Sequence, residues 1–212
     1  MNRYKLVIFD FDGTLADSAR WLRGVVHELA ARHGFRAPTD LEFDTLRGKN
    51  TLAILEHLGV SLWKVPFIAR HLREMVARDA HAIALFDGVA ELLDALTARG
   101  VAVAVVSSNA EDNVRRILGP ANASRVQHFA CGAGLFGKGK KFREVLARVG
   151  VTPDETIAIG DEVRDIEAAR AEGIAAGSVT WGYATSELLR AHNPTVLFES
   201  VRELYGMLVP AG

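Results

Sequence analysis

The chain has 212 residues, of which 49% are hydrophobic, and a formal net charge of −1 at pH 7. This length suits one core domain with a smaller inserted one, and the hydrophobic fraction is sufficient for a sizeable core. The near-neutral charge gives no indication of binding to nucleic acid or to an anionic membrane surface. Cys131 is the only cysteine, which excludes an intramolecular disulfide and a metal cage built from cysteines.

The first apolar run, residues 6–9, is too short for a signal peptide or a membrane span. We therefore expect a cytoplasmic protein with no membrane partner. This run is rich in β-branched residues and ends in a polar loop, as a buried parallel strand does. Residues 101–106 and 156–159 repeat the pattern, and residues 174–179 form a weaker strand.

Amphipathic helices are predicted at residues 88–98, 140–149 and 163–172, each followed by a glycine. Strands that alternate with helices favour an α/β fold, a three-layer Rossmann-like core around a parallel sheet.

Residues 17–85 differ, because they contain no convincing strand. Helices are expected there at 19–33, 50–58 and 62–80. The prediction is a catalytic core of residues 1–16 and 86–212, with an all-helical cap of residues 17–85 inserted after the first strand.

Polar side chains follow three of the predicted strands. In doubly wound sheets, ligands bind beyond the carboxyl ends of the strands, so these side chains should converge on one crevice. They are Asp10 and Asp12 after the first strand, Ser107 and Asn109 after the second, and Asp161 and Asp165 after the third.

Asp10 and Asp12 leave the first strand as alternate residues, and Gly13 gives the chain freedom to turn both toward one site. Two carboxylates this close repel each other unless a cation or a proton lies between them. Mg²⁺, a hard ion that prefers oxygen ligands, suits such a pair. The alternative is an ordinary Asp-Gly turn, but the matching Gly160-Asp161 pair favours a functional site.

These motifs carry a family resemblance. Asp10-x-Asp12-Gly13-Thr14, Ser107 after a strand, a later lysine, and Asp161-x-x-x-Asp165 resemble the haloacid dehalogenase superfamily. The chain looks closest to the phosphoglycolate-phosphatase-like branch, which has a helical cap of the C1 type. The resemblance implies a Mg²⁺-dependent hydrolase of a small phosphate monoester, with phosphoglycolate as the candidate substrate.

The resemblance also implies roles for the acidic residues. Asp10 would be the nucleophile that forms an aspartyl-phosphate, and Asp12 the general acid and then the base. Mg²⁺ would be held by Asp10, the backbone carbonyl of Asp12 and Asp161. Asp165 would be a further ligand or a support for one, although an acid in the first turn of a helix is also favourable by itself.

Further residues are assigned to the phosphate and the leaving group. Ser107, with Ser108 and Asn109, would bind a phosphate oxygen at the start of a helix, although this run could equally cap that helix. Lys138 is the preferred candidate for the lysine that neutralises the phosphate and the Asp10 charge, with Lys140 as runner-up and Lys141 also available.

The turn of residues 47–49 in the cap could close over the site, so Arg47 and Lys49 are candidate substrate contacts.

Other activities are weighed against this one. A haloacid dehalogenase does not need Asp12 or Asp161. A sugar phosphomutase shares the first motif but usually has Glu before the aspartate where this chain has Gly160. A non-catalytic binding protein on the same fold would be expected to lose one of the motifs. Glu162, where the branch often has Ser or Thr, weakens a specific phosphoglycolate assignment. The sequence does not indicate the oligomeric state.

Overall fold

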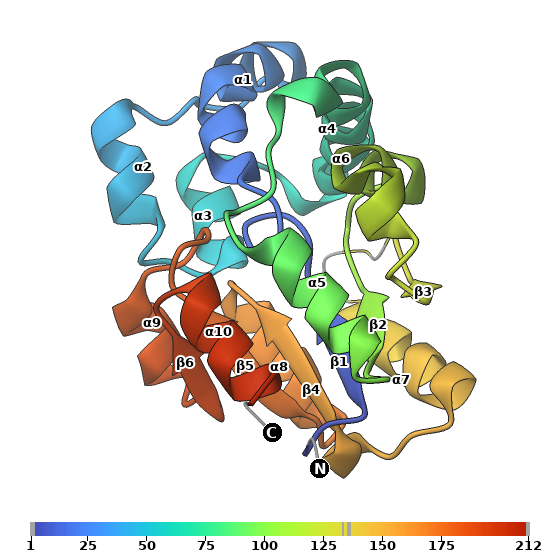
Figure 1. Cartoon of the computed structure of the whole chain (residues 1–212). Coiled ribbons are helices and arrows are strands. Elements are labelled where there is room, and N and C mark those ends of the chain that lie inside the picture. The colour runs from blue at the N-terminus through green and yellow to red at the C-terminus, as the bar shows by residue number, and fades with distance from the viewer. Residues whose placement is uncertain (1–2, 133, 135–136, 211–212) are drawn as a thin grey trace.

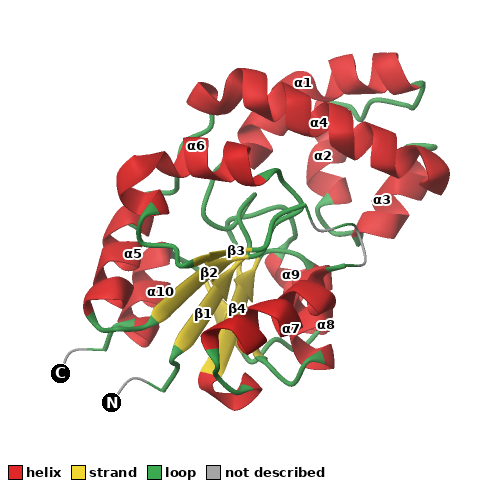
Figure 2. Ribbon diagram, turned by 90° about the vertical axis from the view of Figure 1, so that its right-hand side faces the viewer, coloured by secondary structure: helices red, strands yellow, loops and turns green. Residues whose placement is uncertain are grey.

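The structure is a computed structural model that describes residues 3–132, 134 and 137–210. It contains one sheet of six strands, all of whose pairings are parallel, with helices on both faces (Figures 1 and 2). The spatial order of the strands is β3-β2-β1-β4-β5-β6. Their bounds are Leu6–Phe9 (β1), Ala102–Val105 (β2), His128–Phe129 (β3), Thr156–Gly160 (β4), Ala175–Val179 (β5) and Val196–Phe198 (β6).

Strand β1 lies in the middle of the sheet, between β2 and β4, and all four of its residues are fully buried. Its last residue, Phe9, is in register with Val105 of β2 and Ile159 of β4. Since parallel strands in register end at the same edge, the residues that follow these three strands emerge side by side.

Each face of the sheet has its own hydrophobic core, because side chains of a strand alternate between faces. One core contains apolar residues of α5 (Val89–Ala98) and α10 (Val201–Leu208), together with Phe9 of β1. The other contains apolar residues of α7 (Lys138–Val149), α8 (Val163–Ala171) and α9 (Ser186–Ala191), together with Ile8 of β1. The sheet is thus the middle of three layers, as the prediction of an α/β core required.

Helix α6 (Glu111–Ala123) follows β2 and bends at Gly119. This glycine has a φ of 71° and is followed by Pro120. A helix was expected to begin near Ser107, although no range was predicted for it, whereas the two-residue strand β3 has no counterpart among the predicted elements. Strand β6 and helices α9 and α10 were also not predicted. The four unpredicted elements have two to eight residues each, so they carry little periodic signal.

The segment of residues 17–85, called the cap segment below, lies beyond the carboxyl ends of the strands (Figure 1). It contains helices α1 (Ser18–His33), α2 (Asp40–Leu46), α3 (Thr51–His57) and α4 (Val65–Asp79), and the short 3₁₀ helices 62–64 and 80–82. The whole segment is described by the structure and contains no strand, only one isolated bridge from Leu85 to Ala16. It buries a small cluster of its own around Leu46, Leu58 and Val60.

Within the described residues, no single helix is long and apolar enough to cross a membrane. The bent pair formed by residues 51–57 and 62–82 passes that test by length and composition only.

Candidate active site

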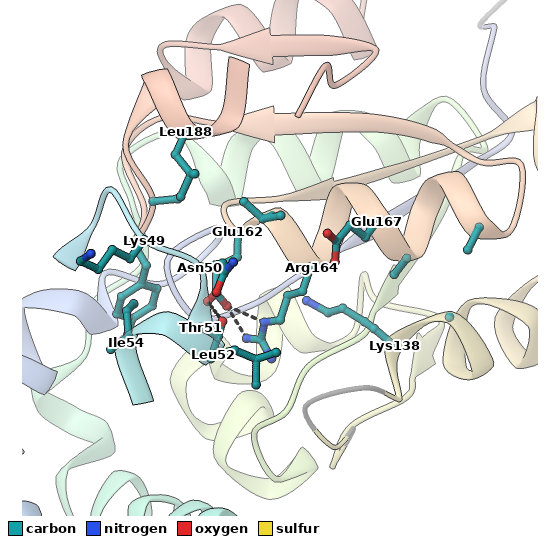
Figure 3. Close-up of a pocket in the computed structure, with 16 residues that line it drawn as sticks. Lys49, Asn50, Thr51, Leu52, Ile54, Lys138, Glu162, Arg164, Glu167 and Leu188 are labelled. Atoms are coloured by element: carbon teal, nitrogen blue, oxygen red, sulfur yellow. Dashed lines mark hydrogen bonds and ion pairs between the residues drawn. The ribbon is translucent and has the colours of Figure 1, made fainter. Parts of the chain in front are cut away.

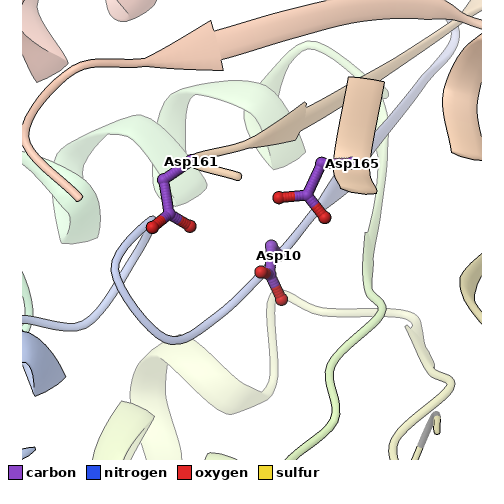
Figure 4. A group of neighbouring side chains, drawn as sticks. All are labelled: Asp10, Asp161 and Asp165. Atoms are coloured by element: carbon purple, nitrogen blue, oxygen red, sulfur yellow. The ribbon is translucent and has the colours of Figure 1, made fainter. Parts of the chain in front are cut away.

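Three aspartates meet beyond the carboxyl end of the sheet (Figure 4). Asp10 follows β1, Asp161 follows β4, and Asp165 lies in the first turn of α8. One carboxylate oxygen from each of them lies within 4.8 Å of the others. All three side chains are buried, so the structure brings together the acidic residues that the sequence predicted to converge.

Lys138, the first residue of α7, provides a positive charge at this cluster. Its Nζ lies 2.9 Å from Oδ2 of Asp10 and also forms an ion pair with Asp165. Only 5% of Lys138 is exposed, whereas Lys140 is exposed and Lys141 pairs with Glu144. The helix begins two residues earlier than predicted, which puts Lys138 rather than Lys140 in the crevice.

Burial dominates the electrostatics of the cluster. It raises the pKa of Asp10 from 3.8 to about 6, although the Lys138 charge opposes the rise. The pKa of Asp161 is raised further above its ordinary value by burial and then by the negative charge of Glu162. Three buried carboxylates, two of which pair with one lysine, form a set of hard oxygen donors with excess negative charge, and this fits a divalent cation such as Mg²⁺.

The Asp161 side chain is fixed by hydrogen bonds to both of its oxygens. Oδ1 accepts a bond of 2.8 Å from the Thr14 hydroxyl, and Oδ2 accepts one of 2.7 Å from the N–H of Tyr183. Two glycines permit this close approach: a Cβ added to Gly13 or to Gly182 would lie 2.3 Å from Oδ2 of Asp161. The sequence reasoning placed Gly13 here but assigned no role to Tyr183 or Gly182.

Asp12 is partly buried and is held by the loop after the neighbouring strand β2. Its Oδ2 accepts a hydrogen bond of 3.1 Å from Nδ2 of Asn109. Burial raises the pKa of Asp12, while the polar side chains of Asn109 and Ser18 oppose the rise. The expected convergence of Asp12 with the loop after β2 is therefore present.

The loop that follows β2 differs from the expectation. Helix α6 begins at Glu111, with Ala110 at its N-cap, so Ser107 is not at a helix start and does not cap one. The Ser107 hydroxyl instead accepts the N–H of Asn109 at 3.0 Å, which shapes the loop. The Ser108 carbonyl accepts a bond of 2.9 Å from Nε of Arg73, a residue of α4 in the cap segment.

Arg47 connects the cap segment to the core through hydrogen bonds. Its guanidinium donates to the carbonyl oxygens of Gly182 and Tyr183, at 3.1 and 3.2 Å, and its own carbonyl accepts the N–H of Thr185. These contacts engage Nε and Nη2, so the structure gives Arg47 a docking role beside any contact with substrate.

A pocket of about 370 Å³ opens between α3 of the cap segment and α8 of the core (Figure 3). Lys49 and Lys138 both contribute to its wall, which links the predicted cap contact with the acidic cluster. Across it, the Thr51 hydroxyl donates to Glu162 at 3.1 Å, and Glu162 pairs with Arg164. Its apolar lining includes Leu52, Ile54, Val163 and Leu188.

Comparison with known proteins decides the family. A model of the haloacid dehalogenase-like hydrolases matches residues 7–179. This chain belongs to that family. The match covers the strands that carry Asp10 and Asp161, and it confirms the resemblance that the motifs indicated.

Three proteins that are similar to this chain carry different names. A phosphoglycolate phosphatase from Synechococcus elongatus is 31% identical over 93% of this chain and 94% of its own length. A tyrosine-protein kinase, PtkA, from Mycobacterium tuberculosis is 30% identical over 96% of this chain and 73% of its own. The crystal structure of a predicted phosphatase from Clostridium acetobutylicum superposes with a TM-score of 0.81 at 22% identity, and covers 98% of this chain and 99% of that one.

Proposed function

We propose that this hydrolase is a Mg²⁺-dependent phosphatase that cleaves a small phosphate monoester through an aspartyl-phosphate on Asp10. Its place among phosphate-monoester hydrolases follows from the family and from its phosphatase relatives. The observation that supports the mechanism best is the environment of Asp10. This buried carboxylate lies between a lysine and two further carboxylates, at the end of the central strand.

The metal would be held by Asp10, Asp161 and the backbone carbonyl of Asp12. Both oxygens of Asp165 already have partners in the protein: Oδ1 pairs with Lys138, and Oδ2 accepts the N–H of Glu162 at 3.0 Å. We propose Asp165 as a further ligand or as a support that holds Lys138 beside Asp10. When bound, Mg²⁺ supplies positive charge for the phosphate oxygens and the Asp10 carboxylate.

The residues then divide the chemistry between them. An oxygen of Asp10 attacks phosphorus as the bond from phosphorus to the ester oxygen breaks, and Asp12 gives its proton to that oxygen. Asp12, now a carboxylate, takes a proton from the water that attacks the aspartyl-phosphate, which releases inorganic phosphate and restores Asp10. Lys138 stabilises the negative charge shared by Asp10 and the phosphate. We assign the phosphate-binding contact to Ser107 and its neighbours in the loop after β2.

The substrate is proposed to be a small phosphorylated metabolite, with phosphoglycolate as the first candidate because a relative carries that name. Residues 17–85 are proposed to form a cap domain that selects the leaving group through Arg47 and Lys49. The remaining residues are proposed to be the catalytic core, and we propose a cytoplasmic location.

The test begins with p-nitrophenyl phosphate and Mg²⁺. The wild-type chain should release phosphate, EDTA should abolish the activity, and Asp10→Asn should reduce it at least about a thousandfold. Asp87→Asn, at an exposed position outside the site, is the matched control and should keep full activity. Acid-quenched wild-type enzyme should carry one phosphoryl group on the peptide that contains Asp10. Wild-type turnover that survives in Asp10→Asn would refute the mechanism.

The similarity to a tyrosine-protein kinase requires a second assay, which tests for phosphoryl transfer to tyrosine. The phosphorylated enzyme should transfer its phosphoryl group to water and not to a tyrosine-containing peptide. Phosphotyrosine formation would replace hydrolysis with phosphoryl transfer as the function.

A further inference from the structure

Arg164, the second residue of α8, lies in the wall of the pocket between α3 and α8 (Figure 3). Its side chain is 25% exposed and extends from the helix toward Thr51 of the cap segment. Lys138, whose amino group lies beside the Asp10 carboxylate, lines the same pocket. The pocket that begins at the proposed nucleophile therefore contains a second cationic side chain.

The guanidinium of Arg164 is held along one of its edges. Its Nε donates a hydrogen bond of 2.6 Å to Oε2 of Glu162, and its Nη2 forms an ion pair with the same oxygen. The other oxygen of Glu162, Oε1, accepts a bond of 3.1 Å from the hydroxyl of Thr51. Glu162 is thus bound both by the core and by the cap segment, and it fixes the plane of the guanidinium.

A second edge of this guanidinium is available to a ligand. The N–H groups of a guanidinium lie in one plane, and Glu162 engages only the edge formed by Nε and Nη2. Within the residues that the structure describes, Nη1 of Arg164 has no hydrogen-bond partner. One N–H of Nη1 and the remaining N–H of Nη2 are parallel, and such a pair matches the two oxygens of a carboxylate.

The charges of the pocket favour a single additional negative charge. Burial lowers the pKa of Arg164, but the charges of Glu162 and of the site aspartates outweigh burial and raise it, so the guanidinium stays protonated. Apart from the lysine beside the nucleophile, the charged residues of the lining are Lys49 and Arg164, which are positive, and Glu162 and Glu167, which are negative. A carboxylate adds one negative charge to this balanced set, whereas a second phosphate adds nearly two.

We propose that Arg164 binds a carboxylate on the leaving group and thereby selects phosphate esters of hydroxy acids as substrates; this inference rests on the proposed phosphatase function. The phosphoryl group lies at Asp10 beside Lys138, and the hydroxy acid extends into the pocket to the available edge of Arg164. Glu162 is a positioning residue in this arrangement, because it fixes the guanidinium. Esters of neutral alcohols and sugars lack the carboxylate, so they are poorer substrates.

Matched pairs of esters test this assignment. Each pair consists of a hydroxy-acid phosphate and the ester in which a hydroxymethyl group replaces the carboxylate. The pairs are phosphoglycolate with hydroxyethyl phosphate, and phosphoglycerate with glycerol phosphate. In at least one pair, the wild type should prefer the acid in kcat/KM by about tenfold or more, which is the factor expected for a hydrogen-bonded charge pair.

Two substitutions of Arg164 then identify the residue responsible. In Arg164→Gln, the ratio of kcat/KM for the acid to that for its neutral partner should fall at least about tenfold. The ratio is the readout, because a loss of folded enzyme reduces both values by the same factor. Arg164→Lys keeps a cation beside Glu162 but lacks the planar pair of N–H groups, so its ratio should fall at least about threefold. This second variant provides the test if the first does not fold.

Arg190→Gln is the matched control. Arg190, on α9, forms an ion pair with Glu199 in which both side chains are exposed, and neither residue lines the pocket. Its ratio should equal that of the wild type, because an exposed pair of this kind contributes little to the structure.

Three outcomes would overturn the proposal. They are a wild type that cleaves p-nitrophenyl phosphate but prefers the acid in neither pair, an unchanged ratio in either Arg164 variant, and a preference for ethanediol bisphosphate over both acids. A wild type that does not cleave p-nitrophenyl phosphate at all would instead refute the phosphatase function on which the proposal rests.

Discussion

Replacing Asp10 with asparagine should change how the stability of the protein depends on pH. The substitution preserves the size of the side chain but removes its titration. Burial raises the pKa of Asp10 from 3.8 to about 6 despite the nearby Lys138. The folded protein therefore binds this proton more tightly than the unfolded chain does. The resulting stabilisation is fully present below the unfolded pKa and is lost as the pH rises through the folded one.

The size of the effect follows from the two pKa values. A carboxyl whose pKa moves from 3.8 to about 6 contributes about 3 kcal/mol over the whole range, most of it lost between about pH 4 and about pH 7. Asparagine contributes no such change. The unfolding free energy of Asp10→Asn, relative to the wild type, should therefore increase by about 2.5 kcal/mol across that interval.

Urea unfolding in EDTA, at several pH values between about 4 and 7, measures this difference directly. Asp87→Asn serves as the control, because Asp87 is exposed and has no ion pair within the described residues. Its difference from the wild type should stay constant over the same interval. A constant difference for Asp10→Asn would refute the reasoning, and a difference that decreases with pH would mean that the ion pair with Lys138 outweighs burial.

Other predictions concern the same cluster. Lys138→Met leaves buried carboxylates without their cation, so we expect a loss of about 3–5 kcal/mol in urea unfolding of the metal-free protein and at least a hundredfold loss of kcat. Gly182→Ala would place a Cβ 2.3 Å from Oδ2 of Asp161, and Mg²⁺ affinity by calorimetry should fall at least about tenfold. Gly206→Ala, in an open part of α10, should bind Mg²⁺ normally, and its free energy of unfolding should be about 0.5–1 kcal/mol higher than that of the wild type. Mg²⁺ at a hundred times its Kd should stabilise the wild type by about 2.7 kcal/mol, with no such gain after EDTA treatment.

Much of this architecture was predictable because it rests on strong local signals. The strand before Asp10 is apolar throughout, and a parallel sheet must place its loop beside those that follow the neighbouring strands. The convergence of Asp10, Asp161 and Asp165 could therefore be predicted from the order of the strands, without any measured distance. Lys138 was preferred among three lysines, and the structure places it beside Asp10 and Asp165, although the helix was expected to start at residue 140.

The rest depends on contacts that a pattern does not reveal. Arg47 was predicted from its charge, but its binding to backbone carbonyls of residues 182 and 183 follows from the meeting of two distant loops. The role of Ser107 in its loop likewise depends on a helix that starts four residues later. Tyr183 lies after a weak strand in the sequence, and only the fold brings it to Ser18. Short elements such as β3 offered too few residues for any periodicity.

The central place of β1 also sets the order in which the enzyme can mature during synthesis. Strand β1 is made early, but both strands that flank it come after residue 101, and the last acid of the cluster is residue 165. A nascent chain that has exposed only its first 100 residues holds Asp10 and all four helices of the cap segment without a neighbour for the central strand. Such a chain leaves a fully apolar strand without a neighbour until β2 is made, about half-way through translation, and without its second neighbour until β4 is made. We therefore expect release of the chain around α7 to yield an aggregation-prone fragment, and an extension that reaches the end of α8 to give the first fragments able to bind metal.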